Sequence, residues 1–471
     1  MRSLLTLLFA SANVLTVADT PSRATGPDGR FISWKEHLID GERLSGGVQL
    51  RGADGLHMAD FDKDGHLDIV SVHEDSSHIR LAFGSANPDR WHLATLAENA
   101  EANAAEDAAV VDLNGDGWPD ILAACELAHV IYFQNPGRAD LVRAGKWRRV
   151  IPDKMKDRGS FIRVFAADLD GDGRHEVLTP NKGEQLPTDN PNTQRDWRFP
   201  KKEISWWTVP RDPLDPKGWI EHVLTRVEIP INVQPIDIDK DGDLDILAGA
   251  RGEGRSIVFE NVTAKGAAPR FREHPIKVTG HTEPHALGPK NLTSFMADAA
   301  DLNGDGRVDL VMNETNAKLC WLEQPKSLDE PWVLHHIGTI APDTPTGITL
   351  GDIDGDGKLD VITGGYSQNP RDHDGANITA KSVAGRIAWF RNPGDPTRPW
   401  IRQDIARNKR GMYDAFVARD MDGDGDLDFV GTRGNSGEFD GVYWIEQVRS
   451  REPRKAFTPA RAKESEPLPL P

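Results

Sequence analysis

Seven short acidic segments recur along the chain, and they restrict its fold more than any other feature. In the segment 352–360, Asp occupies the first, third, fifth and ninth positions and Gly occupies the sixth. Apolar residues that favour β-strands follow directly after the ninth position. The same nine-residue pattern is present in all seven segments, and its first, third, fifth and ninth residues are Asp60, Asp62, Asp64 and Asp68; Asp112, Asn114, Asp116 and Asp120; Asp168, Asp170, Asp172 and Glu176; Asp237, Asp239, Asp241 and Asp245; Asp301, Asn303, Asp305 and Asp309; Asp352, Asp354, Asp356 and Asp360; and Asp420, Asp422, Asp424 and Asp428.

Alternate oxygen side chains in a tight loop are typical of a calcium site. Ca²⁺ takes roughly six to eight oxygen ligands, and a Gly at the sixth position permits the sharp turn that gathers them. An EF-hand loop is longer, ends in a bidentate Glu and leads into a helix, whereas each of these segments leads into a strand. The sequence therefore predicts up to seven structural Ca²⁺ ions, one in each loop.

The spacing of the loops predicts a repeat unit of fifty-odd residues. Successive first Asp residues lie 52, 56, 69, 64, 51 and 68 residues apart. Each unit contains one strand that runs into the loop, one that leaves it, an aromatic third strand and a fourth that opens on an aromatic residue. In the first unit we expect these strands at 55–61, at 67–73, at 79–83 and from Trp91 onwards. Four strands in each repeat indicate the blade of a β-propeller.

The count of fourth strands predicts how the ring closes. After the third strand at 442–445, no fourth strand follows, but a matching segment at 34–39 precedes the first loop. We therefore expect an all-β, seven-bladed β-propeller of four-stranded blades, in which an N-terminal strand completes the last blade. Such closure removes open sheet edges, which would otherwise promote aggregation.

These seven loops resemble those of the FG-GAP or VCBS repeat family, whose best-known members are the calcium-bearing propellers of integrin alpha chains. The resemblance covers about residues 31–447 and implies a calcium-loaded propeller, with the ligand roles falling on the matching loop positions. It does not imply one activity, because this architecture is used by adhesion receptors, lectins and sugar-processing enzymes.

The remaining segments predict a secreted or periplasmic protein. Residues 1–18 contain an early Arg2, an apolar run and small-residue cleavage positions, which is typical of a signal peptide. Residues 19–30 form an N-terminal linker, residues 31–447 the propeller and residues 448–471 a tail that we expect to be disordered, because it lacks apolar periodicity. Cys125 and Cys320 fall in different blades and are expected to be buried and unpaired.

The acidic composition argues against a nucleic-acid partner. The formal net charge is −18, and seven bound Ca²⁺ ions would offset most of it. No segment is long and apolar enough to be expected to span a membrane. We expect a monomer that binds a carbohydrate or glycan.

The face of the ring opposite the acidic loops is the candidate functional face, because the turns between second and third strands and the links between blades emerge there. Binding and catalytic groups concentrate in loops on a rigid scaffold. These segments also contain Glu74, Lys182 and Arg251, and the last of these, with Arg255, offers guanidinium groups to a carboxylate or sulfate. The candidate catalytic residues are His73, Glu126, His129, Arg163, Arg255, Tyr413, His281, Glu283 and His285.

His281, Glu283 and His285 form the densest cluster in this set. Two imidazoles and one carboxylate on alternate positions suit either a transition metal or acid–base chemistry, although solvated loop histidines give the same pattern. The sequence does not show whether a further ligand from His73 or from Glu126 and His129 lies nearby.

Two functions agree with this candidate face. The first is a carbohydrate lyase or dehydratase, since elimination needs a base of near-neutral pKa and a cation to stabilise the developing enolate. A weaker architectural resemblance to the propeller domain of the aldos-2-ulose dehydratases supports it, without any matched catalytic residue. The alternative is a non-catalytic module that binds glycan or protein. A lectin would repeat its binding residues from blade to blade, and the residues on this face do not repeat.

Overall fold

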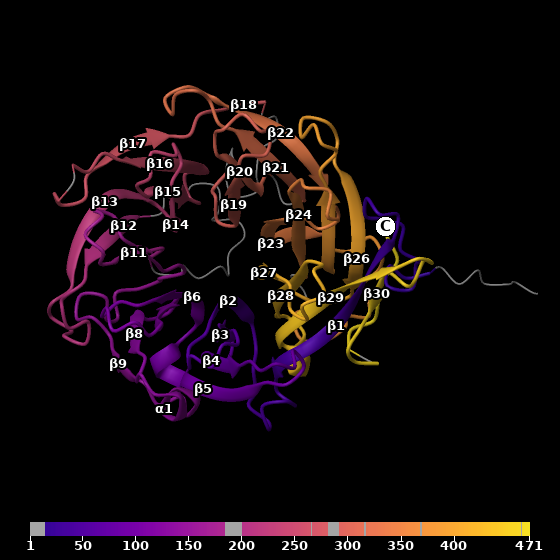
Figure 1. Cartoon of the computed structure of the whole chain (residues 1–471), viewed down its shortest axis with the longest axis horizontal. Coiled ribbons are helices and arrows are strands. Elements are labelled where there is room, and N and C mark those ends of the chain that lie inside the picture. Colours follow the sequence, from indigo (N-terminus) through magenta and orange to yellow (C-terminus); the bar gives the residue numbers. More distant parts are fainter. Residues whose placement is uncertain are drawn as a thin grey trace, which may run out of the picture.

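The chain folds into a ring of seven antiparallel sheets, which we name blades 1 to 7 in chain order (Figure 1). The structure is a computed structural model that describes residues 15–183, 200–264, 266–280, 292–314, 317–367, 370–462 and 464–471. The predicted all-β propeller with seven blades is confirmed. Each blade contains four antiparallel strands in sequence order from the ring axis outwards, apart from the last blade, whose fourth strand comes from the N-terminal region.

The strands lie close to the predicted positions. Blades 1 to 3 consist of β2 (Ala53–Ala59), β3 (Asp68–His73), β4 (His78–Phe83) and β5 (His92–Glu98); β6 (Ala105–Val111), β7 (Asp120–Cys125), β8 (Val130–Gln134) and β9 (Arg148–Val150); and β10 (Phe165–Ala167), β11 (Glu176–Pro180), β12 (Lys201–Thr208) and β13 (Ile220–Glu228). Blades 4 and 5 consist of β14 (Pro230–Ile236), β15 (Asp245–Ala250), β16 (Arg255–Asn261) and β17 (Phe271–Pro275); and β19 (Ala297–Ala300), β20 (Asp309–Asn313), β21 (Lys318–Glu323) and β22 (Trp332–Thr339), beside which β18 (Val278–Thr279) lies parallel.

Blades 6 and 7 bring the two ends of the chain together. Blade 6 consists of β23 (Thr344–Gly351), β24 (Asp360–Tyr366), β25 (Gly385–Arg391) and β26 (Ile401–Asn408), and blade 7 of β27 (Phe416–Arg419), β28 (Asp428–Arg433), β29 (Gly441–Ser450), β1 (Phe31–Gly41) and β30 (Phe457–Thr458). Helical segments are short and lie in connections: α1 (Ala139–Arg143) and the 3₁₀ turns η1 (Asn99–Ala102) and η2 (Gly437–Phe439).

The predicted closure of the ring is confirmed. Strand β1 pairs antiparallel with β29 from Phe31 opposite Ser450 to Gly41 opposite Gly441. The strand predicted at 34–39 is therefore the fourth strand of blade 7, and it hydrogen-bonds an edge that would otherwise be open.

The core lies between neighbouring blades. Phe83 of blade 1 and Phe133 of blade 2 share one buried apolar cluster, and Trp321 of blade 5 and Phe390 of blade 6 share another. Cys125 lies in the first of these clusters and Cys320 in the cluster between blades 4 and 5. Both are buried and unpaired, as expected. Aromatic side chains that recur in third strands thus serve packing between sheets.

The tail differs from the disorder expected for residues 448–471. Strand β29 continues to Ser450, and β30 pairs parallel with β1. Phe457 and Leu468 are buried, and Leu468 exchanges backbone hydrogen bonds with Val17 and Arg407. A few isolated apolar anchors order this segment, and they form no periodic pattern that the sequence could reveal.

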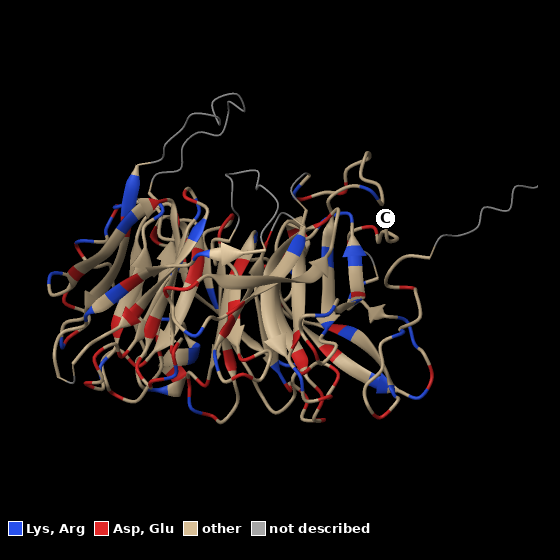
Figure 2. Cartoon of the chain, turned by 90° about the horizontal axis from the view of Figure 1, so that it is seen from above, with Lys and Arg blue, Asp and Glu red and all other residues tan. Residues whose placement is uncertain are grey.

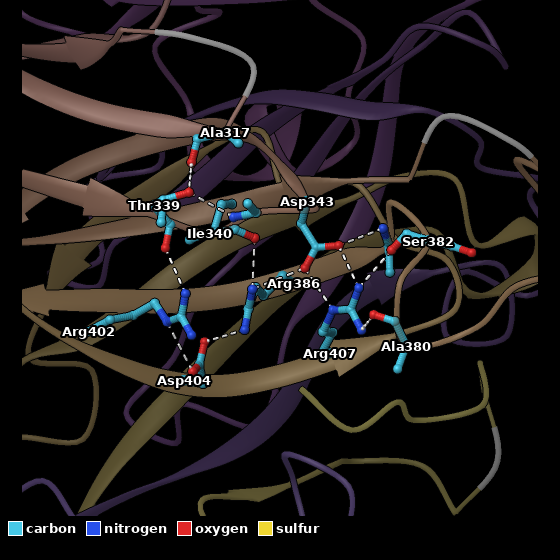
Figure 3. Close-up of polar contacts among 12 residues, drawn as sticks. Ala317, Thr339, Ile340, Asp343, Ala380, Ser382, Arg386, Arg402, Asp404 and Arg407 are labelled. Carbon is cyan, nitrogen blue, oxygen red and sulfur yellow. Dashed lines mark hydrogen bonds and ion pairs between the residues drawn. The ribbon is translucent and has the colours of Figure 1, made fainter. Parts of the chain in front are cut away.

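A buried charge cluster in blade 6 also holds the tail (Figure 3). The Asp343 carboxylate lies 3.2 Å from the Arg386 guanidinium and 2.7 Å from that of Arg407, and all three side chains are fully buried. Arg386 also pairs with Asp404 at 2.8 Å, while Arg407 donates to the carbonyl of Pro469 at 3.0 Å. Each buried charge in this cluster faces an opposite charge, which offsets the cost of removing it from water.

The first strand of every blade is the innermost one (Figure 1). Inner strands of adjacent blades contact each other, as β2 does with β6 and β23 with β27. Each inner strand runs towards its acidic loop, and acidic side chains recur in the loops along one edge of the ring (Figure 2). The first residues of the inner strands therefore gather around the ring axis at the opposite face.

Candidate functional site

Each acidic loop is closed by hydrogen bonds from its own backbone. In the second loop, the Asp112 carboxylate accepts hydrogen bonds from Gly115 N–H at 2.8 Å and from Gly117 N–H at 2.7 Å. Gly117 has φ of 85°, and all seven sixth-position glycines have φ between 84° and 99°. This left-handed conformation strains residues with a side chain, which explains why Gly is present at every sixth position.

The ninth-position acid joins the loop to the third strand. Asp120 accepts hydrogen bonds from Leu113 N–H at 3.1 Å, Asn135 N–H at 2.8 Å and the Tyr132 hydroxyl at 2.7 Å. Burial raises the pKa of Asp120 to about 6. The backbone bond to the second loop residue recurs at all seven ninth positions, namely Asp68, Asp120, Glu176, Asp245, Asp309, Asp360 and Asp428.

The loops fit the expected metal. Carboxylate oxygens lie within 4.8 Å of one another in the groups Asp60, Asp62 and Asp68; Asp168, Asp170 and Glu176; Asp237, Asp239 and Asp245; and Asp352, Asp354 and Asp356. Hard oxygen donors at this separation suit Ca²⁺. In three loops a guanidinium also approaches the acids, since Arg143 pairs with Asp64 at 2.7 Å, Arg391 pairs with Asp354 at 2.5 Å and Arg307 pairs with Asp305.

A second group of acids lies at the ring axis on the opposite face, and we call it the axial cluster. It comprises Asp54 of β2, Glu74 after β3, Glu106 of β6 and Asp414 before β27. Carboxylate oxygens of Asp54, Glu74 and Glu106 lie within 4.8 Å of one another. Burial raises the pKa of Asp54, and the neighbouring Glu106 and Asp414 carboxylates add to this shift.

Crowding and burial make these acids hard to ionise. Burial and the neighbouring Glu74 and Asp414 carboxylates raise the pKa of Glu106 to about 8. Burial and the nearby Glu106 raise the pKa of Asp54, and burial also raises the pKa of Asp414. Near neutral pH the axial cluster therefore holds protons that can be transferred.

Two guanidinium groups lie beside the axial cluster. Arg163 and Arg251 lie over the ring of Phe295, at 4.8 Å and 4.7 Å from its centroid. Arg163 is also 3.6 Å from the Asp107 carboxylate. Burial lowers the pKa of Arg251, and repulsion from Arg163 adds to this lowering while Glu106 opposes it.

Lys182 approaches the same group of acids from blade 3. It forms an ion pair with Glu126. Burial and the nearby Arg251 lower the pKa of Lys182, and the Glu106 and Glu74 carboxylates oppose this shift. The predicted residue Glu126 therefore borders the axial cluster through Lys182.

One imidazole lies on an inner strand near these groups. His57 of β2 has Nε2 3.8 Å from the Asp107 carboxylate, which also faces Arg163, and 41% of its side chain is exposed. His57 was not among the predicted site residues.

Several predicted residues have structural positions instead. His73 is fully buried, contacts the Ser71 hydroxyl at 3.1 Å, and burial lowers its pKa to about 3. His129 is buried with Nε2 2.9 Å from the carbonyl of Glu101, and Tyr413 is buried in the core of blades 6 and 7. All three side chains are buried, and their role as acid–base groups stays a prediction.

The other predicted residues divide between the site and its surroundings. Arg255 lies on β16 and pairs with Glu253 at 2.7 Å. His281, Glu283 and His285 lie outside the described residues, so a transition metal there stays a prediction. Of the six predicted residues that the structure describes, Arg163 alone belongs directly to the axial site.

The sequence-based prediction did not include Asp54, Glu106, Phe295 and Asp414. These residues precede or begin inner strands, and no local motif distinguishes them. A simple signal does locate them. Each of these four residues lies six positions before the first Asp of its own loop. Counting back from every loop would have shown which side chains begin the inner strands around the axis.

Comparison with known proteins shows FG-GAP-like repeats in the chain. The family model of the FG-GAP-like repeat matches residues 60–123, 112–179 and 301–363. No curated protein matches the chain. Among the described residues, no helix is long and apolar enough to cross a membrane.

Solved structures resemble the chain in overall arrangement only. YCF48 from Cyanidioschyzon merolae has a TM-score of 0.48 and 8% identity, and the match covers 88% of this chain and 98% of that one. BBS1N, from a complex with ARL6DN, has a TM-score of 0.44 and 8% identity, with 86% and 95% covered.

Proposed function

We propose that this FG-GAP-like propeller is a carbohydrate-active enzyme of the lyase or dehydratase type, and that the axial cluster carries out its proton transfers. The single observation behind this proposal is the convergence of Glu106, Asp54 and Asp414 beside Arg163 and Arg251. Each of these five residues comes from a different blade or from the segment just before it, yet they lie close to one another at the ring axis.

The proposed chemistry follows from the protonation of these groups. In its ionised form, which gains population as the pH approaches its pKa of about 8, Glu106 accepts the proton from a carbon next to a carbonyl or carboxylate. Arg163 lies close enough to Glu106 to stabilise the negative charge that develops on that group. Asp54, whose pKa is raised by burial and by Glu106, gives its proton to the oxygen that leaves.

The asymmetry of the axial face supports one site rather than several. Acids come from blades 1, 2 and 7, whereas the guanidinium groups and Phe295 come from the segments of blades 3 to 5. A lectin with a similar site in each blade would repeat these residues around the ring.

We also propose that the acidic loops bind Ca²⁺ as structural ions and that the protein acts outside the cytoplasm as a monomer. Alternate carboxylates of modest affinity fill at millimolar calcium, which extracellular fluid supplies. The first, third and fifth residues would hold the ion, with the ninth completing the site.

A non-catalytic binding module is the second candidate. It is favoured by the burial of His73, His129 and Tyr413, since these were the imidazole and phenol groups expected to serve as exposed acids or bases. In such a module, the same axial groups would only hydrogen-bond a glycan or a protein.

A turnover assay separates the two candidates. Keto-sugars and uronate-containing glycans are incubated with the full chain, and the unsaturated product is followed by its ultraviolet absorbance. We expect Glu106→Gln to lower turnover about 100-fold, because general bases contribute at least that much. Glu98→Gln, an exposed acid on the outer strand of blade 1, is the matched control. Binding without turnover of any sugar in the panel would favour the binding module.

A further inference from the structure

Arg251 is the cation of the axial site that has no acidic partner. Among the residues that the structure describes, no carboxylate forms an ion pair with it, and its guanidinium contacts the Phe295 ring. Other basic side chains near the axis are paired, Lys182 with Glu126 and Arg371 with Asp75 at 2.8 Å.

Arg163 adds unused hydrogen-bonding capacity beside it. Its Nη2 donates to the carbonyl of Phe295 at 3.4 Å, but its Nε is buried without a hydrogen-bond partner. Among the described residues, the one carboxylate that forms an ion pair with this guanidinium is Asp107, at 3.6 Å. A buried donor left without a partner costs about 1–3 kcal/mol, which a ligand oxygen would recover.

The acids of the axial cluster do not neutralise this pair of guanidinium groups. Glu106 is the nearest candidate, and its raised pKa keeps it largely protonated near neutral pH. While Glu106 is protonated, no ionised carboxylate among the described residues pairs with Arg251, so its charge beside the Phe295 ring attracts an anion.

We propose that Arg163 and Arg251 form an anion subsite that binds the carboxylate of an acidic sugar such as a uronate. Planar guanidinium groups match the two oxygens of a carboxylate better than they match a hydroxyl group. The aromatic face of Phe295 holds both groups in place. This inference rests on the proposed function, and it supplies the substrate class.

The subsite also places the reacting carbon. With the carboxylate held by the two guanidinium groups, the C–H bond next to it faces the acids of the axial cluster. Glu106 takes that proton, the C–H electron pair becomes a C=C bond, and the C–O bond to the β-oxygen breaks. The leaving oxygen receives the proton of Asp54, so atoms and charge balance without a redox partner.

Binding to a variant that cannot turn over tests the subsite apart from catalysis. Calorimetric titration uses the Glu106→Gln chain, with a glucuronate-containing oligosaccharide, its neutral glucose counterpart and a sulfated neutral counterpart as probes. We expect the uronate probe to bind at least about 10-fold more tightly than the neutral one, and added salt to weaken it.

Adding Arg251→Gln to the Glu106→Gln chain should lower uronate affinity about 10-fold to 100-fold and leave the affinity for the neutral probe unchanged. Arg163→Gln is a second variant in case the first fails to fold, and Arg272→Gln, on the outer strand of blade 4 with Glu260 as its partner, is the matched control. Equal binding of acidic and neutral probes, or no effect of either variant, overturns the subsite. Tighter binding of the sulfated probe overturns its assignment to a carboxylate.

The two proposals fail separately. Charge-selective binding without turnover by the unmodified chain retains the subsite and rejects the enzyme. Turnover of a neutral keto-sugar that depends on Glu106, with no preference for acidic probes, retains the enzyme and rejects the subsite.

Discussion

Asp120 and Glu106 are acids of the same blade on adjacent strands, the first buried and the second partly exposed, and their surroundings differ completely. Asp120 lies at the loop face and accepts three hydrogen bonds from backbone and hydroxyl donors. Glu106 lies at the axial face among other carboxyl groups. The carboxylate oxygens of Asp120 accept hydrogen bonds from its own repeat. The charge of Glu106, by contrast, is removed by a proton or balanced by a neighbouring cation. An acid that recurs in every blade supports the fold, whereas an acid surrounded by other acids indicates a catalytic or binding site.

The loop face should respond most strongly to calcium removal. Acids gathered in one loop repel each other unless a cation lies between them, and a site filled at a hundred times its Kd stabilises the fold by about 2.7 kcal/mol. We expect excess chelator to lower the melting temperature by many degrees and added Ca²⁺ to restore it, measured by calorimetry. Chelation should leave the affinity of axial ligands unchanged in the fraction that stays folded. An unchanged melting temperature would reject the calcium assignment.

Removing the repeated acid should destabilise the protein. Asp120→Ala leaves the backbone N–H groups of Leu113 and Asn135 without acceptors inside the blade. Each unmade buried hydrogen bond costs about 1–3 kcal/mol, so we expect a loss of about 2–4 kcal/mol in unfolding free energy. Urea denaturation in saturating Ca²⁺ measures it. The exposed acid Asp157→Ala is the control, and a loss below about 0.5 kcal/mol for Asp120→Ala would contradict the role given to it.

The axial acid should show the opposite behaviour. Glu106→Gln keeps the size and the hydrogen-bonding ability of the protonated side chain, so we expect unfolding free energy at pH 6 to stay within about 0.5 kcal/mol of the unmodified chain. Activity should fall about 100-fold in the same variant. Urea denaturation measures the unfolding free energy and a turnover assay measures the activity, both on the same preparation of the variant. Loss of both properties together would mean that Glu106 supports the fold, as Asp120 does.

The pH dependence gives the smallest effect. The pKa of Glu106 is raised to about 8 in the fold, so the folded chain keeps a proton that the unfolded chain releases near the usual Glu value of about 4.3. Stability should therefore fall as pH rises between these values, whereas turnover should rise as pH approaches 8. We expect Glu106 to contribute about 1 kcal/mol to the change in unfolding free energy with pH. One unit of pKa corresponds to about 1.36 kcal/mol, and solvent reduces the effect because the side chain is partly exposed.

Stability in saturating Ca²⁺ at pH 6 and pH 8 measures this contribution. The loss between these values should be smaller in Glu106→Gln than in the unmodified chain. An identical pH profile for both chains would show that Glu106 ionises normally.

The loop motif allowed the fold to be predicted because its information is local. Nine residues contain the oxygen ligands, the left-handed Gly and the start of the next strand, and seven copies set the number of blades. Even the closing strand β1 could be predicted, since one blade lacked a fourth strand. The ordered tail could not be predicted, because its buried side chains Phe457 and Leu468 are isolated and do not recur at a regular spacing.

The axial site depended on tertiary structure. Asp54 and Asp414 belong to the first and last blades, and they lie close together because β1 joins blade 7 to the N-terminal end and closes the ring. Likewise Arg163 and Arg251 come to one Phe295 ring from different blades. The sequence determined which residues begin each inner strand, since local spacing fixes them. Ring closure decided which of them meet, because a contact across the axis leaves no spacing pattern in the chain.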